Sequence, residues 1–511
     1  MTHRRLARIR IGAATGVAAL AGTLAMSGTV QAAVTVDTRP LRDAVTVTGV
    51  MDHLEAFQDI ADANGGNRQA GTSGHDASVD YVEALLDDAG YVTTRQEFSY
   101  ERTDFTGSSL AMTAPATQTY TLGTDYLPMD FSGGGTASAP VTVVDVNLTG
   151  DRASTSGCEA SDFAGFPSGN IALIQRGSCN FSVKADNATA AGASAVIIFN
   201  QGNVDPADDR LSLFGGTLDP PVRSIPVVST SFAQGETWAT TPGLQLSITL
   251  RITLEQVTTE NLLADTPTGR TDRTVVVGGH LDSVGEGPGI NDNGSGTAAI
   301  LETALQMAEL GIEPENRVRF AFWSGEEDGL LGSEHYVSQL STRERKGTAL
   351  NLNFDMVGSP NSVNFVYDGD GDALGVSGPN GSGLIEDSFT DFFTSQGELS
   401  EPTDFDGRSD YFAFINAGIP AGGLFTGAEG IKSEQQAVDY GGTAGQAYDP
   451  CYHAACDDIT NIDEATLDLM SDAIAHATLM FAETTSAVNG TGKGNGTGKV
   501  DWQYKGNHAL R

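Results

Sequence analysis

The sequence predicts an α/β protein with a mixed central sheet flanked by helices and interrupted by a β-rich insertion. From about residue 261 onward, short apolar runs typical of buried strands alternate with stretches of helical periodicity. Between about residues 106 and 256, short Val- and Ile-rich runs are instead separated by Gly, Pro and Ser turns. A chain of 511 residues is also too long for one ordinary core, so more than one domain is expected.

The first 32 residues have the pattern of a secretory signal peptide. Four arginines precede an apolar run at residues 11–26, and Val30-Gln-Ala32 fits a small-residue cleavage site. A membrane anchor is the alternative, but the run is short and rich in Gly, Ala and Thr. We therefore expect cleavage near Ala32 and a secreted, extracellular, soluble protein.

Two helices and a strand are predicted before the insertion. Helical periodicity covers residues 50–61 and 75–89, and Gly90 supplies a stop for the second helix. The Gly-rich stretch 64–74 between them is a loop, and residues 91–100 alternate as a strand does.

The insertion contains a predicted helix at residues 183–191 but no plausible catalytic cluster. Its predicted strands are 141–146, 171–174, 195–199, 225–229 and 246–254.

Beyond residue 261 the predicted strands are 274–277, 318–323, 349–354, 364–367 and 421–424, and the predicted helices are 297–310, 332–340, 383–396 and 464–481. Ligands of such sheets bind beyond the carboxyl ends of the strands. Residues 488–511 form a Gly-rich tail that is expected to be a flexible linker.

The net charge limits the possible binding partners, and the number of cysteines bears on the state of the thiols in an exported chain. Sixty-six acidic against 28 basic residues give a formal charge of −38, which disfavours nucleic acid and anionic membranes as partners. Four cysteines in an exported chain indicate two disulfides rather than a thiol nucleophile. Pairing of neighbours, Cys158 with Cys179 and Cys451 with Cys456, is the simplest of three connectivities.

Polar residues with metal-ligand chemistry follow the predicted strand 274–277. His280 and Asp282 lie at its end, and Asp292 follows in a Gly-rich turn before an apolar helix. An imidazole and a carboxylate on neighbouring loops can converge on one cation. The alternative is an ordinary strand-to-helix connection whose polar residues cap the helix.

Three more candidate sites have loop positions of the same kind: Glu326-Glu327 and Asp355, which follow strands, and His453 in the loop that Cys451–Cys456 would close. Alone, each has an ordinary interpretation as a solvated loop, a helix cap or an exposed histidine. Together, two histidines and three carboxylates suffice for two metals with a shared bridging carboxylate and a bridging water.

These motifs resemble those of the secreted double-zinc aminopeptidases of the bacterial leucine-aminopeptidase type, particularly the streptomycete enzymes. The resemblance covers about residues 45–100 and 261–485. Its motifs include Gly278-Gly-His-Leu-Asp-Ser283, Gly289-Ile-Asn-Asp-Asn-Gly-Ser-Gly296, Gly325-Glu-Glu327, Asn353-Phe-Asp-Met-Val-Gly-Ser-Pro360, Asp406-Gly-Arg-Ser-Asp410, Gly422-Gly-Leu-Phe-Thr-Gly-Ala428 and Cys451-Tyr-His453. Residues 169–181 and the Ala-Gly-Ala-Ser-Ala stretch that begins at residue 191 resemble a protease-associated (PA) domain.

The resemblance implies a discontinuous catalytic domain at residues 41–105 and 258–487, with a PA domain inserted at 106–257. It implies two Zn²⁺ ions per chain. The implied ligands are His280 and Asp355 for one zinc, Glu327 and His453 for the other, with Asp292 as the bridge. Asp282 is expected to orient the His280 imidazole. The Asp292–Asn293 peptide bond is expected to be cis.

The implied reaction is hydrolysis of the N-terminal peptide bond of peptides and proteins. Two cations sharing a water lower its pKa, Glu326 acts as the general base, and Tyr452 donates to the oxyanion. Glu326, Asp355 and the Arg408 loop would recognise the free α-amino group. Met356 and Phe425 would line a pocket for large hydrophobic first residues, although each is equally compatible with plain core packing.

Calcium is a weaker expectation from the same resemblance. Asp468 and Asp472 match acidic positions that hold structural calcium in streptomycete relatives, but they also fit a solvated helix face.

We expect a monomer. The alternative functions are a dipeptidase or carboxypeptidase of the same superfamily, which would need basic residues for an α-carboxylate, and an inactive PA-containing binding protein, which predicts broken ligand positions. Metal geometry alone also leaves a zinc phosphoesterase or deacylase open.

Overall fold

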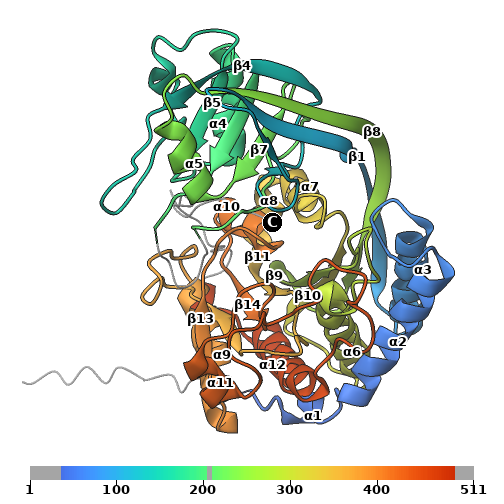
Figure 1. Cartoon of the computed structure of the whole chain (residues 1–511). Coiled ribbons are helices and arrows are strands. Elements are labelled where there is room, and N and C mark those ends of the chain that lie inside the picture. The colour runs from blue at the N-terminus through green and yellow to red at the C-terminus, as the bar shows by residue number, and fades with distance from the viewer. Residues whose placement is uncertain (1–35, 204–209, 490–511) are drawn as a thin grey trace, which may run out of the picture. The chain divides into compact units, whose positions relative to one another are not determined.

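The computed structural model describes residues 36–203 and 210–489 (Figure 1). The predicted signal peptide lies outside these residues, as does the predicted tail apart from residues 488 and 489.

The chain first forms the helices α1 (Arg39–Arg42), α2 (Val47–Ala63) and α3 (Ser73–Asp88). The last two are those predicted from periodicity, and both begin earlier than predicted because a threonine caps each of them. The Thr46 hydroxyl accepts a hydrogen bond from the third residue of α2, and the Thr72 hydroxyl does the same for α3. Such caps satisfy amide groups that have no partner within the helix.

Outside the insertion, the central sheet is mixed, with strand order β13-β12-β14-β11-β9-β10-β8, where β13 is Glu401–Thr403, β12 is Phe365–Tyr367 and β8 is Gln245–Asp265. The pairs β12–β14 and β10–β8 are antiparallel and the other neighbours are parallel. β9 (Arg270–His280) lies between β10 (Asn316–Trp323) and β11 (Thr348–Phe354), and β11 also pairs in parallel with β14 (Ala421–Phe425). Every residue of β11 is buried. This burial explains the continuous apolar runs, because a sheet covered on both faces has no solvent side.

Helices pack around this sheet, as Figure 1 shows for α6, α9 and α12. One apolar core joins these helices to the strands and to α2 and α3. The remaining elements after β9 are η2 (Ile290–Ser295), α6 (Gly296–Glu309), α7 (Leu331–Gln339), α8 (Thr342–Gly347), β12 (Phe365–Tyr367), α9 (Ser382–Gln396), β13 (Glu401–Thr403), α10 (Tyr411–Asn416), α11 (Glu434–Tyr440), α12 (Glu464–Glu483) and α13 (Ser486–Asn489).

Two long strands, one before and one after the insertion in the sequence, form an antiparallel ribbon. β1 (Val92–Ala114) pairs with β8 (Gln245–Asp265) along its whole length, and the two strands run side by side in Figure 1. β8 also pairs with β10, so one end of the ribbon belongs to the central sheet. Both strands run through the domain boundaries predicted at residues 105 and 258. The domain boundaries at these residues stay a prediction.

In the insertion, β4 (Gly135–Val144), β5 (Ile171–Gln175), β6 (Ala195–Phe199) and β7 (Val227–Thr230) are parallel neighbours. β4 also pairs with β8 in antiparallel orientation, so these strands continue from the ribbon. Two apolar clusters fill the interior of the insertion. Its other elements are β2 (Gln118–Tyr120), β3 (Leu127–Pro128), η1 (Ala160–Phe163), α4 (Phe181–Ala190) and α5 (Phe232–Ala239). The predicted Cys158–Cys179 disulfide is present here.

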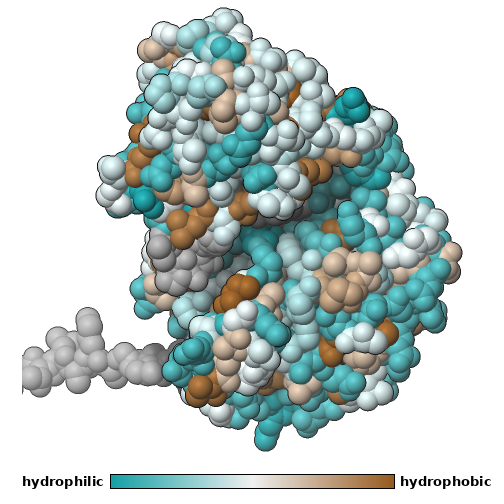
Figure 2. Space-filling view, in the orientation of Figure 1, coloured by the Kyte–Doolittle hydropathy of each residue, from teal (hydrophilic) through white to brown (hydrophobic). Residues whose placement is uncertain are grey.

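The face shown in Figure 2 is largely hydrophilic, with small separate apolar spots. In the part of the chain that the structure describes, none of the helices combines the length and apolar character needed to cross a membrane.

Candidate metal centre and substrate pocket

The candidate ligands meet at the carboxyl ends of three neighbouring parallel strands. His280 is the last residue of β9, Asp355 follows β11 directly, and Glu326 and Glu327 follow β10. Because parallel strands end at the same edge of a sheet, side chains distant in sequence come together there.

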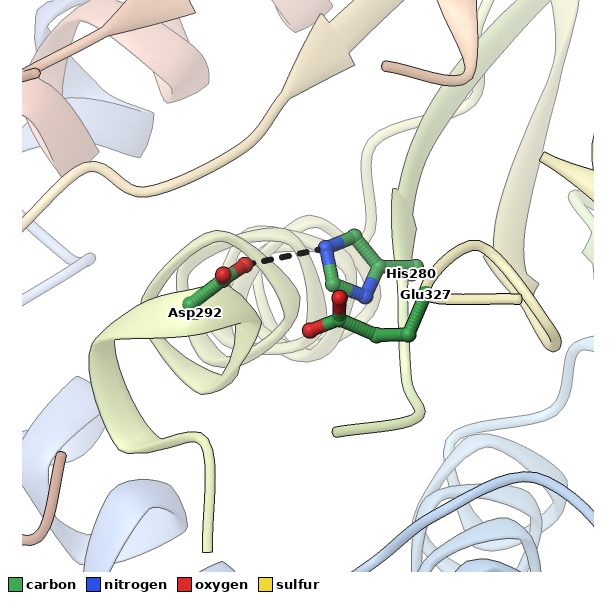
Figure 3. Close-up of side chains that lie close together, drawn as sticks. All are labelled: His280, Asp292 and Glu327. Atoms are coloured by element: carbon green, nitrogen blue, oxygen red, sulfur yellow. Dashed lines mark ion pairs between the residues drawn. The ribbon is translucent and has the colours of Figure 1, made fainter. Parts of the chain in front are cut away.

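His280 lies between two carboxylates. Its Nε2 is 3.3 Å from Asp292 Oδ1 and 3.2 Å from Asp355 Oδ1, and its side chain is 1% exposed. Glu326 Oε2 is 4.0 Å from the same nitrogen. His280, Glu326 and Asp355 therefore form one group of potential metal ligands, and His280, Asp292 and Glu327 form another (Figure 3).

His453 approaches Asp292 from the opposite side. Its Nε2 is 3.2 Å from Asp292 Oδ2 and 3.0 Å from Glu327 Oε2. Asp292 thus presents its two oxygens to two different histidines. His453 lies in the small loop closed by the predicted Cys451–Cys456 disulfide, which is present, and its backbone is left-handed, with φ 54°.

Asp292 itself lies in the short irregular helix η2, just before α6. The Asp292–Asn293 peptide bond is cis, as expected. The carboxylate of Asp457 accepts the backbone N–H of Asn291 at 2.9 Å and that of Asp292 at 3.0 Å. These contacts fix the turn from which the Asp292 side chain projects.

The centre is strongly electronegative. Burial alone would lower the pKa of His280, but Asp355, Glu326 and Asp292 together raise it well above its ordinary value. The pKa of His453 is raised in the same way against its burial, chiefly by Glu327 and Asp292. Burial raises the pKa of Asp292, yet the two imidazoles hold it well below its usual range. The buried carboxylates outnumber the two imidazoles that can carry a positive charge. Such an excess of buried negative charge favours bound cations.

Asp282 lies beside His280 and also contacts the loop after β10, and its role in orienting the imidazole stays a prediction. Its carboxylate accepts the N–H of Glu326 at 3.3 Å and that of Glu327 at 3.4 Å. The His280 Nδ1 lies 3.8 Å from this carboxylate but 3.1 Å from the Asp282 main-chain oxygen. Asp282 therefore contacts the loop after β10 at least as directly as it contacts the imidazole.

A pocket opens beside the metal-ligand group and contains the predicted substrate residues. Its lining consists of Asp292, Glu326, Glu327, Asp355, Met356, Tyr367, Thr403, Asp404, Asp406, Arg408, Ser409, Phe425, Ala428, Tyr452 and His453. The lining includes Met356 and Phe425, whose role in binding a hydrophobic first residue stays a prediction, and Asp404 and Asp406 add two further carboxylates.

Tyr452 and Arg408 are in contact within this pocket. The Arg408 Nη2 donates to the Tyr452 hydroxyl at 3.2 Å, and Tyr452 stacks on the His453 ring at a centroid distance of 3.8 Å. Burial raises the pKa of Tyr452 well above its ordinary value. Glu429 holds Arg408 with two hydrogen bonds, of 2.7 and 3.2 Å.

Sequence reasoning missed several residues that support the site. Ser409 donates to Asp355 Oδ2 at 2.6 Å, and the buried Arg68 donates to Pro288 O and Gly289 O in the loop between His280 and Asp292. Glu429 and Asp457 were missed as well. A usable signal existed for Ser409, which belongs to the same motif as Arg408, and for Arg68, the one charged residue in the loop 64–74.

The residues proposed for calcium lie on α12, away from this group. Asp472 Oδ2 accepts a hydrogen bond from Arg42 Nη1 at 3.3 Å, so a cation of the chain itself already lies beside this carboxylate. Burial raises the pKa of Asp472 despite Arg42, with Asp468 and Asp43 adding repulsion. Calcium at Asp468 and Asp472 stays a prediction.

Comparison with known proteins identifies the family. Residues 261–478 match the model of peptidase family M28, and residues 138–238 match the PA domain. An aminopeptidase of Pseudomonas aeruginosa is 49% identical over 444 residues, which are 86% of this chain and 82% of the relative. A probable lipoprotein aminopeptidase of Mycobacterium tuberculosis is 41% identical over 464 residues, 88% of each chain.

Solved structures agree with this assignment. A zinc aminopeptidase from Bacillus subtilis is 25% identical with a TM-score of 0.56, covering 89% of this chain and 98% of that one. An aminopeptidase from Aneurinibacillus sp. strain AM-1 has the same fold, with 24% identity and a TM-score of 0.67 over 86% of this chain and 95% of that one. The chain therefore belongs to peptidase family M28 and carries a PA domain. This membership confirms the predicted class of enzyme, a zinc-dependent aminopeptidase.

Proposed function

We propose that this chain is a secreted aminopeptidase that removes the first residue of peptides and proteins with two zinc ions and a glutamate base. The observation that carries the proposal is the position of Asp292, whose two oxygens face two different histidines, each of which also meets a second carboxylate. His280, Asp292 and Asp355 would hold one zinc, and His453, Asp292 and Glu327 would hold the other.

The donor set fits zinc. Zinc prefers imidazole nitrogens and carboxylate oxygens, and a catalytic site leaves a position open for water or substrate. Glu327 Oε1 is buried and, among the described residues, has no hydrogen-bond partner, as expected of an atom that faces a cation. Bound zinc supplies Lewis acidity to the scissile carbonyl and to the attacking water.

Glu326 is the general base. Its carboxylate lines the pocket beside the ligand group, 4.0 Å from His280 Nε2, so an attacking water lies within its reach. Glu326 takes the proton from this water and passes it to the nitrogen of the leaving amine. The Asp282 carboxylate, which accepts the Glu326 N–H, fixes the main chain of the base.

Tyr452 donates a hydrogen bond to the developing oxyanion. Because burial raises its pKa well above the ordinary value, its hydroxyl keeps its proton near neutral pH. The hydroxyl oxygen already accepts from Arg408 Nη2, so its own proton points elsewhere. A preorganised donor of this kind acts on the charge that develops in the transition state.

The pocket supports an exopeptidase acting at the amino end of the substrate. Met356 and Phe425 offer an apolar wall for a large hydrophobic first residue, and the carboxylates of the lining suit an α-ammonium group. Arg408 is engaged by Glu429 and Tyr452, which argues against its use as the grip for an α-carboxylate in a carboxypeptidase.

Secretion is supported by two features of the chain. The first 32 residues have a signal-peptide pattern, and both disulfides, Cys158–Cys179 and Cys451–Cys456, suit an oxidising compartment.

The test is the release of 4-nitroaniline from a panel of aminoacyl derivatives, with and without an N-terminal acetyl group. Zinc-loaded enzyme should cleave the free leucyl derivative and leave the acetylated one intact, and chelator treatment should abolish the reaction. Glu326→Gln should lower kcat by about 10²- to 10⁴-fold while zinc content stays at two ions per chain.

Glu309→Gln is the matched control, because Glu309 is exposed at the end of α6 and should leave kcat unchanged. Equal cleavage of the acetylated substrates would refute an aminopeptidase, and an undiminished rate in Glu326→Gln would refute the assignment of the base.

A further inference from the structure

The loop that carries Glu326 and Glu327 is attached at both ends to the β1–β8 ribbon. This catalytic loop, residues 324–332, connects β10 to the start of α7. Near its beginning, the Ser324 N–H donates to Asn261 Oδ1 at 3.0 Å, and the Ser324 hydroxyl bonds that of Thr259 at 2.6 Å. At its end, Asn261 Nδ2 donates to Gly332 O at 2.8 Å. Asn261 and Thr259 belong to β8, so one strand holds the two ends of the loop together.

The other strand of the ribbon contacts the loop next to the two glutamates. The Tyr100 hydroxyl of β1 donates to Asp328 Oδ2, and Arg102 Nη1 lies 3.6 Å from the same oxygen. Tyr100 and Arg102 are two residues apart, so both side chains project from the same face of the strand. The side chains of Arg102 and Asp328 are only 12% and 13% exposed, which makes this contact stronger than an ion pair in solvent.

Apolar packing accompanies these polar contacts. Leu331, in the second half of the loop, belongs to the same buried cluster as Phe98, Tyr100 and Val257 of the ribbon. The two ends of the loop therefore share Asn261 of the ribbon, Leu331 adds apolar contacts, and the middle of the loop contacts the Asp282 carboxylate beside the metal-ligand group.

We propose that Tyr100 and Arg102 position the catalytic loop through Asp328, and so set the place of the Glu326 carboxylate. The PA domain, residues 138–238, lies in the sequence between β1 and β8, so the ribbon that leads to it is also a support of the active site. Asp328 follows Glu327 directly, and a displacement of its side chain moves the main chain of both glutamates. This inference rests on the proposed role of Glu326.

The size of the effect follows from the demands of proton transfer. A general base acts only within hydrogen-bond reach of the proton it takes, and displacements near 1 Å cost on the order of 10²-fold in rate. Loss of the Tyr100 hydroxyl leaves Arg102 and the Ser324 contacts in place, so the displacement is partial. We expect kcat to fall by about tenfold, with KM changed by less than about twofold.

The experiment compares Tyr100→Phe, Asp328→Ala and the double variant in the full zinc-loaded chain, with leucyl-4-nitroanilide as substrate. Tyr100→Phe and Asp328→Ala should each lower kcat, and the double variant should be no slower than Asp328→Ala alone, since Tyr100 acts through Asp328. Tyr91→Phe is the matched control: the buried Tyr91 hydroxyl donates to Ala304 O at 2.7 Å, away from the loop, so its loss should leave kcat unchanged.

Wild-type kcat in Tyr100→Phe overturns the inference, as does a raised KM at unchanged kcat, or multiplied losses in the double variant. An equal loss of kcat in Tyr91→Phe also overturns it, because the effect would then be general destabilisation. If Tyr100→Phe does not fold, Asp328→Asn carries the same test, since it keeps the shape and removes the charge paired with Arg102. A wild-type enzyme without aminopeptidase activity refutes the proposed function instead.

Discussion

Replacement of Arg68 by methionine tests how the loop between His280 and Asp292 is held. The Arg68 guanidinium is fully buried and lies over the Phe57 ring, 4.9 Å from its centroid. Its Nε donates to Pro288 O at 2.9 Å, its Nη2 to Gly289 O at 2.7 Å, and its Nη1 to Leu281 O. All three acceptors are main-chain carbonyls of the metal-ligand loop.

The expected loss in the free energy of unfolding follows from these three hydrogen bonds. Methionine fills much of the volume but leaves the carbonyls of Leu281 and Pro288 without donors, at about 1–3 kcal/mol each. Gly289 O loses one of its two donors and keeps the Gly294 N–H at 3.0 Å. The loss is reduced because burying the guanidinium is itself unfavourable, as the lowering of its pKa to about 10 by burial indicates. We expect Arg68→Met to lower the free energy of unfolding by about 4 kcal/mol. Arg68→Lys should lose about half as much, since one ammonium group cannot span the three carbonyls.

The effect should extend from stability to metal binding. The loop ends at Asp292, so its disorder lowers zinc affinity by about 10- to 100-fold, the usual range for residues that orient metal ligands. Denaturant unfolding of the chelator-treated protein measures the first effect, and competition with a zinc chelator measures the second. Arg270→Met is the control, because Arg270 is 47% exposed and pairs with Asp272 at the surface, where we expect less than about 0.5 kcal/mol.

Unfolding of Arg68→Met within about 1 kcal/mol of the wild type would refute the reasoning on the three carbonyls. Large destabilisation with unchanged zinc affinity would refute the link from Arg68 to the metal ligands.

Two further predictions concern Asp282 and Lys184. Asp282→Asn replaces a carboxylate that accepts the N–H groups of Glu326 and Glu327, so zinc affinity in the same competition assay should fall by about tenfold; unchanged affinity would contradict this. Burial lowers the pKa of Lys184 in the PA domain from 10.5 to about 7. Above pH 7 the unfolded chain then binds more protons than the folded chain, and stability rises with pH by about 2 kcal/mol from pH 7 to pH 9. Thermal unfolding of the wild type and Lys184→Met at both pH values should show this rise only in the wild type, and equal pH slopes would exclude Lys184 as its source.

The positions of the candidate ligands could be predicted because they depend on local patterns. His280 and Asp355 lie at the ends of apolar runs, and parallel strands that share a sheet must end at a common edge. The partners of Asp282 could not be predicted, because they depend on the path of a loop 44 residues away. The acceptors of Arg68 could not be predicted either, because they are main-chain carbonyl groups, which every residue has.

The same distinction between local patterns and long-range contacts applies to the elements of the fold. Periodicity predicts α2 and α3, and the differences are largest at their first turns, where Thr46 and Thr72 act as caps. The length of the β1–β8 ribbon was not predictable, since Tyr100 pairs with Val257 across 157 residues and neither strand alternates cleanly between polar and apolar residues. Without that pairing, the contact between Tyr100 and Asp328 has no signal in the sequence.

Two supports of different origin therefore hold the two halves of the site. The loop to Asp292 buries its main chain, and buried carbonyl and amide groups need partners; Arg68 supplies donors and Asp457 supplies acceptors. The loop with Glu326 and Glu327 is held instead from outside, by the ribbon. The Asp282 carboxylate, which belongs to the first loop, also accepts the N–H groups of Glu326 and Glu327. The placement of Asp292 relative to Glu326 therefore depends on this contact as well as on the neighbouring parallel strands β9 and β10. The sheet and the Asp282 carboxylate together hold the two loops in one site.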